Sequence, residues 1–136
     1  MAKVTRREAR EIALKVLFSY EFNGSQDIGV FFDETCDSFE LPKDDFAYEI
    51  FAKTIQDIPQ EDEYIVKYSQ GWNIDRIAKI VLCILRMCIC EFTEFDDIPK
   101  RVSMNEYIEL TKKYDLPSVA FVNGIVNNVG KEILKK

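Results

Sequence analysis

The sequence of 136 residues contains no histidine. Histidine is the commonest general base near neutral pH and the commonest zinc ligand, so its absence excludes Ser–His and Cys–His catalysis and most catalytic metal sites. A glycine-rich phosphate loop and a nucleophile elbow are also missing from the sequence. Carboxylate or lysine chemistry stays open, but the run Glu61-Asp62-Glu63 is more typical of a solvated face or a helix start than of a paired acid and base.

Long apolar runs are also missing. None approaches the roughly 18 residues that a membrane-spanning helix needs, and no uninterrupted apolar core follows the basic N-terminus, as a secretory signal would require. The sequence shows no repeat and no long linker, and its length suits one domain with a sizeable core. We therefore expect a single domain, residues 1–136, that lies in the cytoplasm and contacts no membrane.

Cysteine is sparse, with Cys36 alone and Cys83, Cys88 and Cys90 in one segment. In a cytosolic chain these thiols stay reduced. A zinc site is the sharper interpretation, but three cysteines in one helix without histidine form a poor ligand set. We expect the cysteines to be small buried apolar residues, and we expect neither a bound metal nor a cofactor.

Charge is present but unevenly placed. The net charge is −6, yet residues 1–20 carry +3, residues 21–63 carry −11 and residues 64–136 carry +2. The acidic middle therefore sets the total. A local basic patch can still bind a polyanion, because charges act mainly within a Debye length.

Apolar residues recur at helical spacing through nearly the whole sequence. The pattern predicts an all-α fold of about seven helices. Residues 80–85 are apolar on nearly every face, which predicts that the helix containing them lies at the centre of a bundle. The predicted helices span residues 6–22, 28–39, 45–55, 61–68, 74–95, 100 or 103 to 114, and 116–134.

The first helix carries a basic face. Thr5 and Glu8 form a capping-box pattern that starts the helix at about Arg6. At about 100° per residue, three arginines share an arc next to the core stripe, and Lys3 joins them if the helical path extends back that far. Glu8 and Glu11 lie on a different side. This basic strip consists of Lys3, Arg6, Arg7 and Arg10.

Folding alone does not explain the basic strip. A cation in the first turn of a helix costs about 0.3–1 kcal/mol, and glutamate or glutamine would form the helix equally well. An anion would gain from the free amides, the helix dipole and the guanidinium groups together, and the phosphates of a nucleic-acid backbone are its natural form. The alternatives are a solvated basic face or contacts with the acidic middle of the chain.

The C-terminal half contains a second capping-box pattern, Ser103 to Glu106, preceded by the basic pair Lys100-Arg101. Gly124 falls inside a predicted helix, where we expect it to allow close backbone packing. We expect Asn123 to make a hydrogen bond in the core. Phe121 lies in the first turn of the last helix, where it is either a core residue, which position alone favours, or a stacking surface for an unpaired base.

Three stretches together resemble the NusB family of bacterial transcription antitermination factors. They occur in the family's order and spacing, and together they comprise 63 of the 136 residues. The stretches are RREAREIALKVLFSYEF, RIAKIVLCILRMCICEF and IPKRVSMNEYIELTKKYDLPSVAFVNGIV.

The resemblance implies about seven helices in two small bundles set across one another, and no enzymatic activity. It also implies binding to single-stranded boxA-type RNA together with NusE, a ribosomal protein that doubles as a transcription factor. The complex joins the elongating RNA polymerase and suppresses termination. Carried over by position, the RNA-binding residues are Lys3, Arg6, Arg7, Arg10, Lys100, Arg101 and Phe121, and the partner-binding residues are Phe18, Asp75, Lys79 and Arg86.

Other functions stay open at this stage. NusB-like domains also occur fused to ribosomal RNA cytosine methyltransferases, so the chain could act as a free RNA-targeting module. It could also be a scaffold that binds only proteins, including a second copy of itself as a homodimer. An all-α enzyme has little support from the sequence.

Overall fold

The computed structural model describes residues 3–24 and 27–135. Within these residues there are seven α-helices and two short 3₁₀ helices, and no strand, which confirms the all-α prediction. Within the same residues, no helix combines the length and the apolar character that crossing a membrane would require. The chain divides into two compact units, Met1–Gln56 and Asp57–Lys136.

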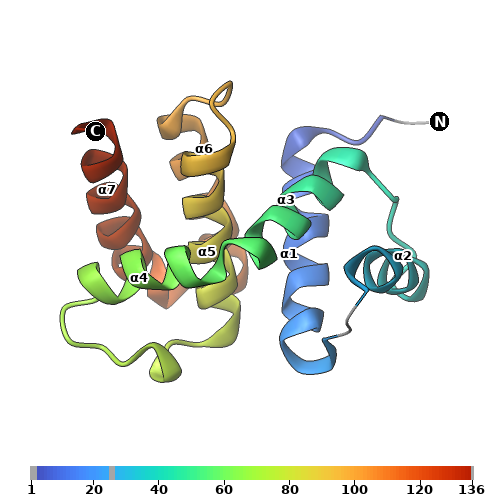
Figure 1. The fold of residues 1–136 in the computed structure, drawn as a ribbon, viewed down its shortest axis with the longest axis horizontal. Helices are drawn as coiled ribbons and strands as arrows, with labels where there is room; N and C mark the ends of the chain where they lie inside the picture. The colour runs from blue at the N-terminus through green and yellow to red at the C-terminus, as the bar shows by residue number, and fades with distance from the viewer. Residues whose placement is uncertain (1–2, 25–26, 136) are drawn as a thin grey trace. The chain divides into compact units, whose positions relative to one another are not determined.

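Figure 1 shows the three helices of the first unit. They bury an aromatic core. Helix α1 (Arg6–Asn23) packs against α2 (Ile28–Ser38) and α3 (Asp45–Gln56). The ring of Phe51 lies at the centre of this core, and its centre is 5.9, 6.3 and 5.7 Å from the ring centres of Tyr20, Phe31 and Phe32. Aromatic burial of this kind contributes both apolar area and favourable edge-to-face contacts.

Each of the three helices in this unit begins next to a residue whose side chain caps it. The Thr5 hydroxyl accepts a hydrogen bond from the Glu8 amide at 3.0 Å, and the Glu8 carboxylate accepts one from the Thr5 amide at 3.0 Å. This confirms the first capping box. Asp27 caps α2 and Asp44 caps α3 in the same manner, each through a side-chain oxygen that accepts a backbone N–H.

The second unit is built around one buried helix. Helix α5 (Lys79–Glu94) packs against α4 (Ile58–Tyr68), α6 (Lys100–Tyr114) and α7 (Val119–Lys135). Every α5 residue from Val81 to Phe92 is buried, which confirms the prediction of a central helix. All four cysteines of the chain are buried, as expected, and none of them forms a disulfide.

Two predicted helix starts in the second unit are wrong. The predicted helix 74–95 is interrupted: a 3₁₀ helix (Ile74–Arg76), capped by Asn73, ends in extended backbone at Ile77, and α5 begins only at Lys79. The predicted helix 61–68 begins earlier, at Ile58, because Pro59 occupies the first turn, where a helix needs no N–H from it.

The second capping box is also wrong. Ser103 lies inside α6 and is fully buried, and its hydroxyl donates a hydrogen bond to Glu91 Oε1 at 2.8 Å. The Tyr107 hydroxyl donates to the other oxygen of the same carboxylate. The buried Glu91 on α5 therefore draws the serine into the core, and α6 starts directly after Pro99 without a side-chain cap.

Candidate nucleic-acid interface

The basic strip lies in the first unit, at the start of α1. Lys3, Arg6 and Arg7 are exposed. The guanidinium carbon of Arg6 lies 4.2 Å from the centre of the Phe46 ring on α3, well inside the roughly 6 Å limit for a cation–π contact. Stacking fixes one face of the guanidinium plane while its N–H edge stays able to donate to an anion.

Arg10 differs from the sequence expectation. It is only 3% exposed, and its guanidinium carbon lies 5.7 Å from the same Phe46 ring. Arg10 follows Arg6 by one turn of the helix, so both arginines reach one side chain of α3. The sequence placed Phe46 in a helix but gave no signal that it would support two arginines, because that contact joins separate helices.

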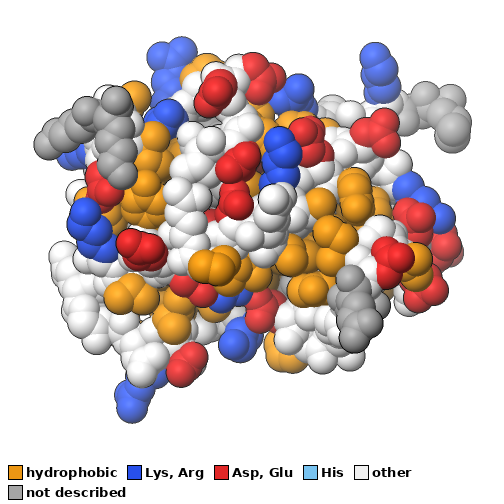
Figure 2. Space-filling model, viewed as in Figure 1, with side chains coloured by type: hydrophobic (Ala, Val, Ile, Leu, Met, Phe, Trp, Pro, Cys, Tyr) orange, Lys and Arg blue, Asp and Glu red, His pale blue; other side chains and the backbone are white. Residues whose placement is uncertain are grey.

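Glu8 does not neutralise the strip in this arrangement. Its carboxylate faces the start of its own helix, where the backbone and side-chain hydrogen bonds from Thr5 lower the pKa of Glu8. The Glu8 carboxylate therefore interacts with the Thr5 amide of the capping box. On the face drawn in Figure 2, Lys and Arg side chains are interspersed with Asp and Glu, so no large area of one sign is visible there.

Phe121 lies in the second unit, half-buried at the start of α7, beside an exposed tryptophan. The centres of the Trp72 and Phe121 rings are 5.9 Å apart, with the ring planes at 65°. Trp72 is 55% exposed. We call these two residues the aromatic pair. The sequence pointed to Phe121 and missed Trp72, although a tryptophan in a short loop was the available signal.

The aromatic pair lines two hollows in the surface of the second unit. One has a volume of about 340 Å³ and is lined by the pair together with residues of the loop and of α5 such as Arg76 and Val81. The other, of about 220 Å³, is lined by the pair together with Tyr68, Gly124 and neighbouring residues. A flat ring entering either hollow would contact Trp72 or Phe121.

Two expectations about α7 are wrong. An added Cβ at Gly124 would meet no atom within 4 Å, so close packing within the chain does not explain this glycine. Asn123 is exposed and does not lie in the core. Both residues face outward because the buried stripe of α7 is formed by Val122, Ile125, Val126 and Val129.

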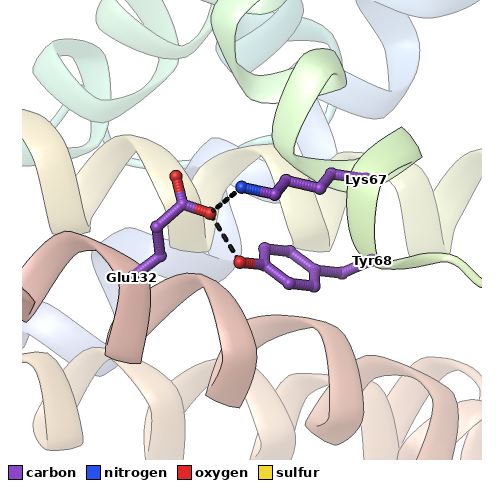
Figure 3. Close-up of polar contacts among 3 residues, drawn as sticks. All are labelled: Lys67, Tyr68 and Glu132. Atoms are coloured by element: carbon purple, nitrogen blue, oxygen red, sulfur yellow. Dashed lines mark hydrogen bonds and ion pairs between the residues drawn. The ribbon is translucent and has the colours of Figure 1, made fainter.

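A polar contact holds the helices beside the aromatic pair. Figure 3 shows Lys67 and Tyr68 reaching from α4 toward Glu132 on α7. The Lys67 ammonium lies 2.7 Å and the Tyr68 hydroxyl 2.5 Å from the same carboxylate oxygen of Glu132. The hydrogen bond to Glu132 raises the pKa of Tyr68. This contact joins α4 to α7 immediately before the loop that carries Trp72.

The remaining predicted residues are divided between the units. Lys100 is half-buried and Arg101 exposed in the first turn of α6, and Asp75 and Lys79 are exposed. In the first unit, Phe18 is half-buried, with its ring 5.1 Å from that of the exposed Phe22.

Arg86, which the resemblance assigns to partner binding, lies largely inside the second unit. It is 8% exposed, and its Nε and Nη2 atoms lie 2.8 and 2.9 Å from the two carboxylate oxygens of Asp62. Such a two-pronged contact fixes both side chains. Arg86 therefore links α5 to α4 within the second unit.

The fold and these surfaces define a small all-α protein with arginines stacked at a helix start and an exposed aromatic pair. A family model and a known relative both match nearly the whole chain and agree with one another. The model of the NusB family matches residues 7–131. A transcription antitermination protein NusB of Natranaerobius thermophilus is 37% identical, over 97% of this chain and 99% of that protein. The chain belongs to the NusB family.

Solved structures agree with this assignment. A structure of NusB from T. maritima has a TM-score of 0.83 at 27% identity and covers 99% of this chain and 100% of that chain. A structure of the antitermination factors NusB and NusE in complex with dsRNA has a TM-score of 0.80 at 24% identity, covering 93% of this chain and 96% of that one, and shows similarity of fold.

Proposed function

We propose that this chain is a transcription antitermination factor that binds boxA-type RNA together with NusE and joins the elongating RNA polymerase in the cytoplasm. Family membership supports this function, since the relative from N. thermophilus is itself named an antitermination protein. In this proposal the chain binds and positions RNA and carries out no catalysis.

The observation that carries the proposal is the placement of Arg6. Its guanidinium is stacked on Phe46 in the first turn of α1, where the helix dipole also favours an anion. We assign Arg6, Arg7 and Lys3 to direct contacts with RNA phosphates. Arg10 is nearly inaccessible, so we assign it to the support of Phe46 and of the local positive charge.

The aromatic pair suits contacts with bases. Single-stranded RNA is recognised largely by stacking of splayed bases on aromatic side chains. Phe121 and the exposed Trp72 border two hollows, so we propose that at least one base stacks there. Lys100 and Arg101 then serve as further phosphate contacts on the second unit.

For NusE we retain Phe18, Asp75 and Lys79 as proposed contacts, because each keeps some exposure to solvent. Arg86 is held by Asp62, so we assign it to positioning α4 and α5. If NusE contacts both this chain and the RNA, it should tighten RNA binding, because its contact with the RNA then forms within an already assembled complex.

The test is a fluorescence-anisotropy titration of a boxA RNA and a scrambled RNA of equal length, with and without recombinant NusE. Because the related complex contains dsRNA, a duplex of the same sequence is a third ligand. We expect tighter binding of the single-stranded boxA RNA, and a further gain when NusE is present. Equal affinity for boxA and scrambled RNA under both conditions would refute the proposed specificity.

A further inference from the structure

Glu61 on α4 presents an unusual buried carboxyl group. The residue is 1% exposed. Neither carboxylate oxygen has a hydrogen-bond partner in the described parts of the chain. Transferring a polar group into the interior without a partner is costly, and nearly all buried polar groups in proteins are therefore satisfied. The burial of this unpartnered carboxyl group therefore indicates a ligand.

Two other potential ligands lie beside this carboxyl group. Asp57 precedes it by one turn of α4, and Cys90 is fully buried on α5. One carboxylate oxygen of each acid and the Cys90 sulfur all lie within 4.8 Å of one another. We call these three residues the acid–thiol cluster. Asp57 is half-buried, and its side chain makes no capping hydrogen bond at the start of α4.

The spacing suits a small metal ion. Because no two of the three ligand atoms are more than 4.8 Å apart, an ion placed centrally between them lies at most about 2.8 Å from each. Zinc bonds to oxygen and sulfur measure about 2.0–2.3 Å. Each ligand atom therefore has to move inward by less than about 1 Å, which small rotations of the side chains provide.

The surrounding charges also favour a cation. Burial, followed by the neighbouring charge of Asp57, raises the pKa of Glu61 to about 10, and Arg86 opposes this effect only in part. The Arg86 guanidinium is already engaged by both oxygens of Asp62. A divalent ion would bind the carboxylate form of Glu61 and supply the missing positive charge.

We propose that Asp57, Glu61 and Cys90 bind a divalent transition-metal ion, with Zn²⁺ as the best match. A thiolate combined with two carboxylates suits zinc, whereas Ca²⁺ and Mg²⁺ prefer oxygen ligands alone. Binding releases the protons of Glu61 and of the Cys90 thiol to solvent. The bound ion links α4 to α5, and water can complete its coordination from the partly exposed side of Asp57.

Cobalt is the probe that tests this site. The full chain, freed of metal with a chelator and kept reduced with a phosphine, is titrated with Co²⁺. We expect saturation at one ion per chain, with a near-ultraviolet band from thiolate-to-cobalt charge transfer that Zn²⁺ abolishes. Addition of Zn²⁺ should also raise the unfolding temperature of the protein.

The variants separate the cluster from other thiols. Cys90→Ala should lose the charge-transfer band, whereas Cys88→Ala, an equally buried cysteine of α5 outside the cluster, should keep it. Glu61→Gln keeps the side-chain shape and should weaken Zn²⁺ binding by about tenfold or more. Circular dichroism confirms that each variant is folded.

Three results would overturn the proposal. The wild-type chain could show no saturable cobalt band, in which case Glu61 is buried as a neutral acid or with water. The band could persist in Cys90→Ala, which would place the thiolate elsewhere. The Zn²⁺ affinity of Glu61→Gln could equal that of the wild type, which would remove the carboxyl group from the site.

Discussion

Replacing Glu61 by glutamine should change how the stability of the metal-free protein depends on pH. The ordinary pKa of a glutamate is 4.5, and burial raises that of Glu61 to about 10. Between these two values the folded chain keeps a proton that the unfolded chain releases. The wild-type protein therefore has its full stability below about pH 4.5 and loses it as the pH rises toward 10.

The size of the effect follows from linkage. One extra proton in the folded state lowers the free energy of unfolding by about 1.4 kcal/mol for each pH unit. From pH 6 to pH 8 the wild-type protein should thus lose about 3 kcal/mol that the Glu61→Gln variant, which cannot ionise at this position, keeps. Other titrating groups are common to both proteins and cancel in the comparison.

The assay is urea unfolding at pH 6, 7 and 8 in the presence of a chelator, which keeps metal ions from the acid–thiol cluster. Glu63→Gln is the matched control, because Glu63 is an exposed acid on the same helix, and its stability should follow the wild type within about 0.5 kcal/mol. If the wild type and Glu61→Gln lose stability in parallel over this range, Glu61 ionises near its ordinary pKa despite its burial.

Three further predictions concern the core and the interface. Tyr107→Phe should lower the free energy of unfolding by about 1.5–3 kcal/mol, because it removes a hydrogen bond to the buried Glu91 carboxylate; an unchanged midpoint in thermal unfolding would contradict this. Gly124→Ala should raise that free energy by up to about 1 kcal/mol, since the helix position has open space for a Cβ; a loss of stability by the same measurement would show that something packs there. Phe46→Leu should weaken RNA binding severalfold in anisotropy titrations, because a cation–π contact of about 0.5–1 kcal/mol no longer orients Arg6; unaltered affinity would separate the ring from RNA binding.

The helices themselves could be predicted from the sequence. Their apolar residues recur at the helical period, and the all-round apolar character of residues 80–85 identified the central helix α5. The first capping box was also predictable, because both of its hydrogen bonds join residues only three positions apart. Local signals sufficed wherever local contacts decide the structure.

Features that depend on contacts between helices could not be predicted. Ser103 has the same local pattern as Thr5, but Glu91, twelve positions earlier, draws its hydroxyl into the core. The burial of Arg10 depends on where the chain packs around it, which an angular count along one helix does not contain. The meeting of Glu61 with Cys90 likewise depends on how α4 packs against α5.

The candidate site was predicted in part. The sequence located the basic strip and Phe121, and the structure adds their supports, Phe46 and Trp72. Both supports are aromatic residues far from their partners in the sequence, so periodicity gave no reason to pair them. Whether these residues bind RNA stays a prediction.

The salt dependence of boxA RNA binding by an Arg6→Ala, Arg7→Ala double variant tests the role of the basic strip most directly. Affinity for RNA falls as salt rises, and each phosphate contact adds about 0.7 to the steepness of log affinity against log salt for single-stranded RNA. The double variant should therefore show a slope that is shallower by about 1.4, and a lower affinity at low salt. Lys15→Ala, which removes an exposed cation farther along α1, should leave both nearly unchanged. An unaltered slope and affinity in the double variant would contradict the assignment of these arginines to RNA.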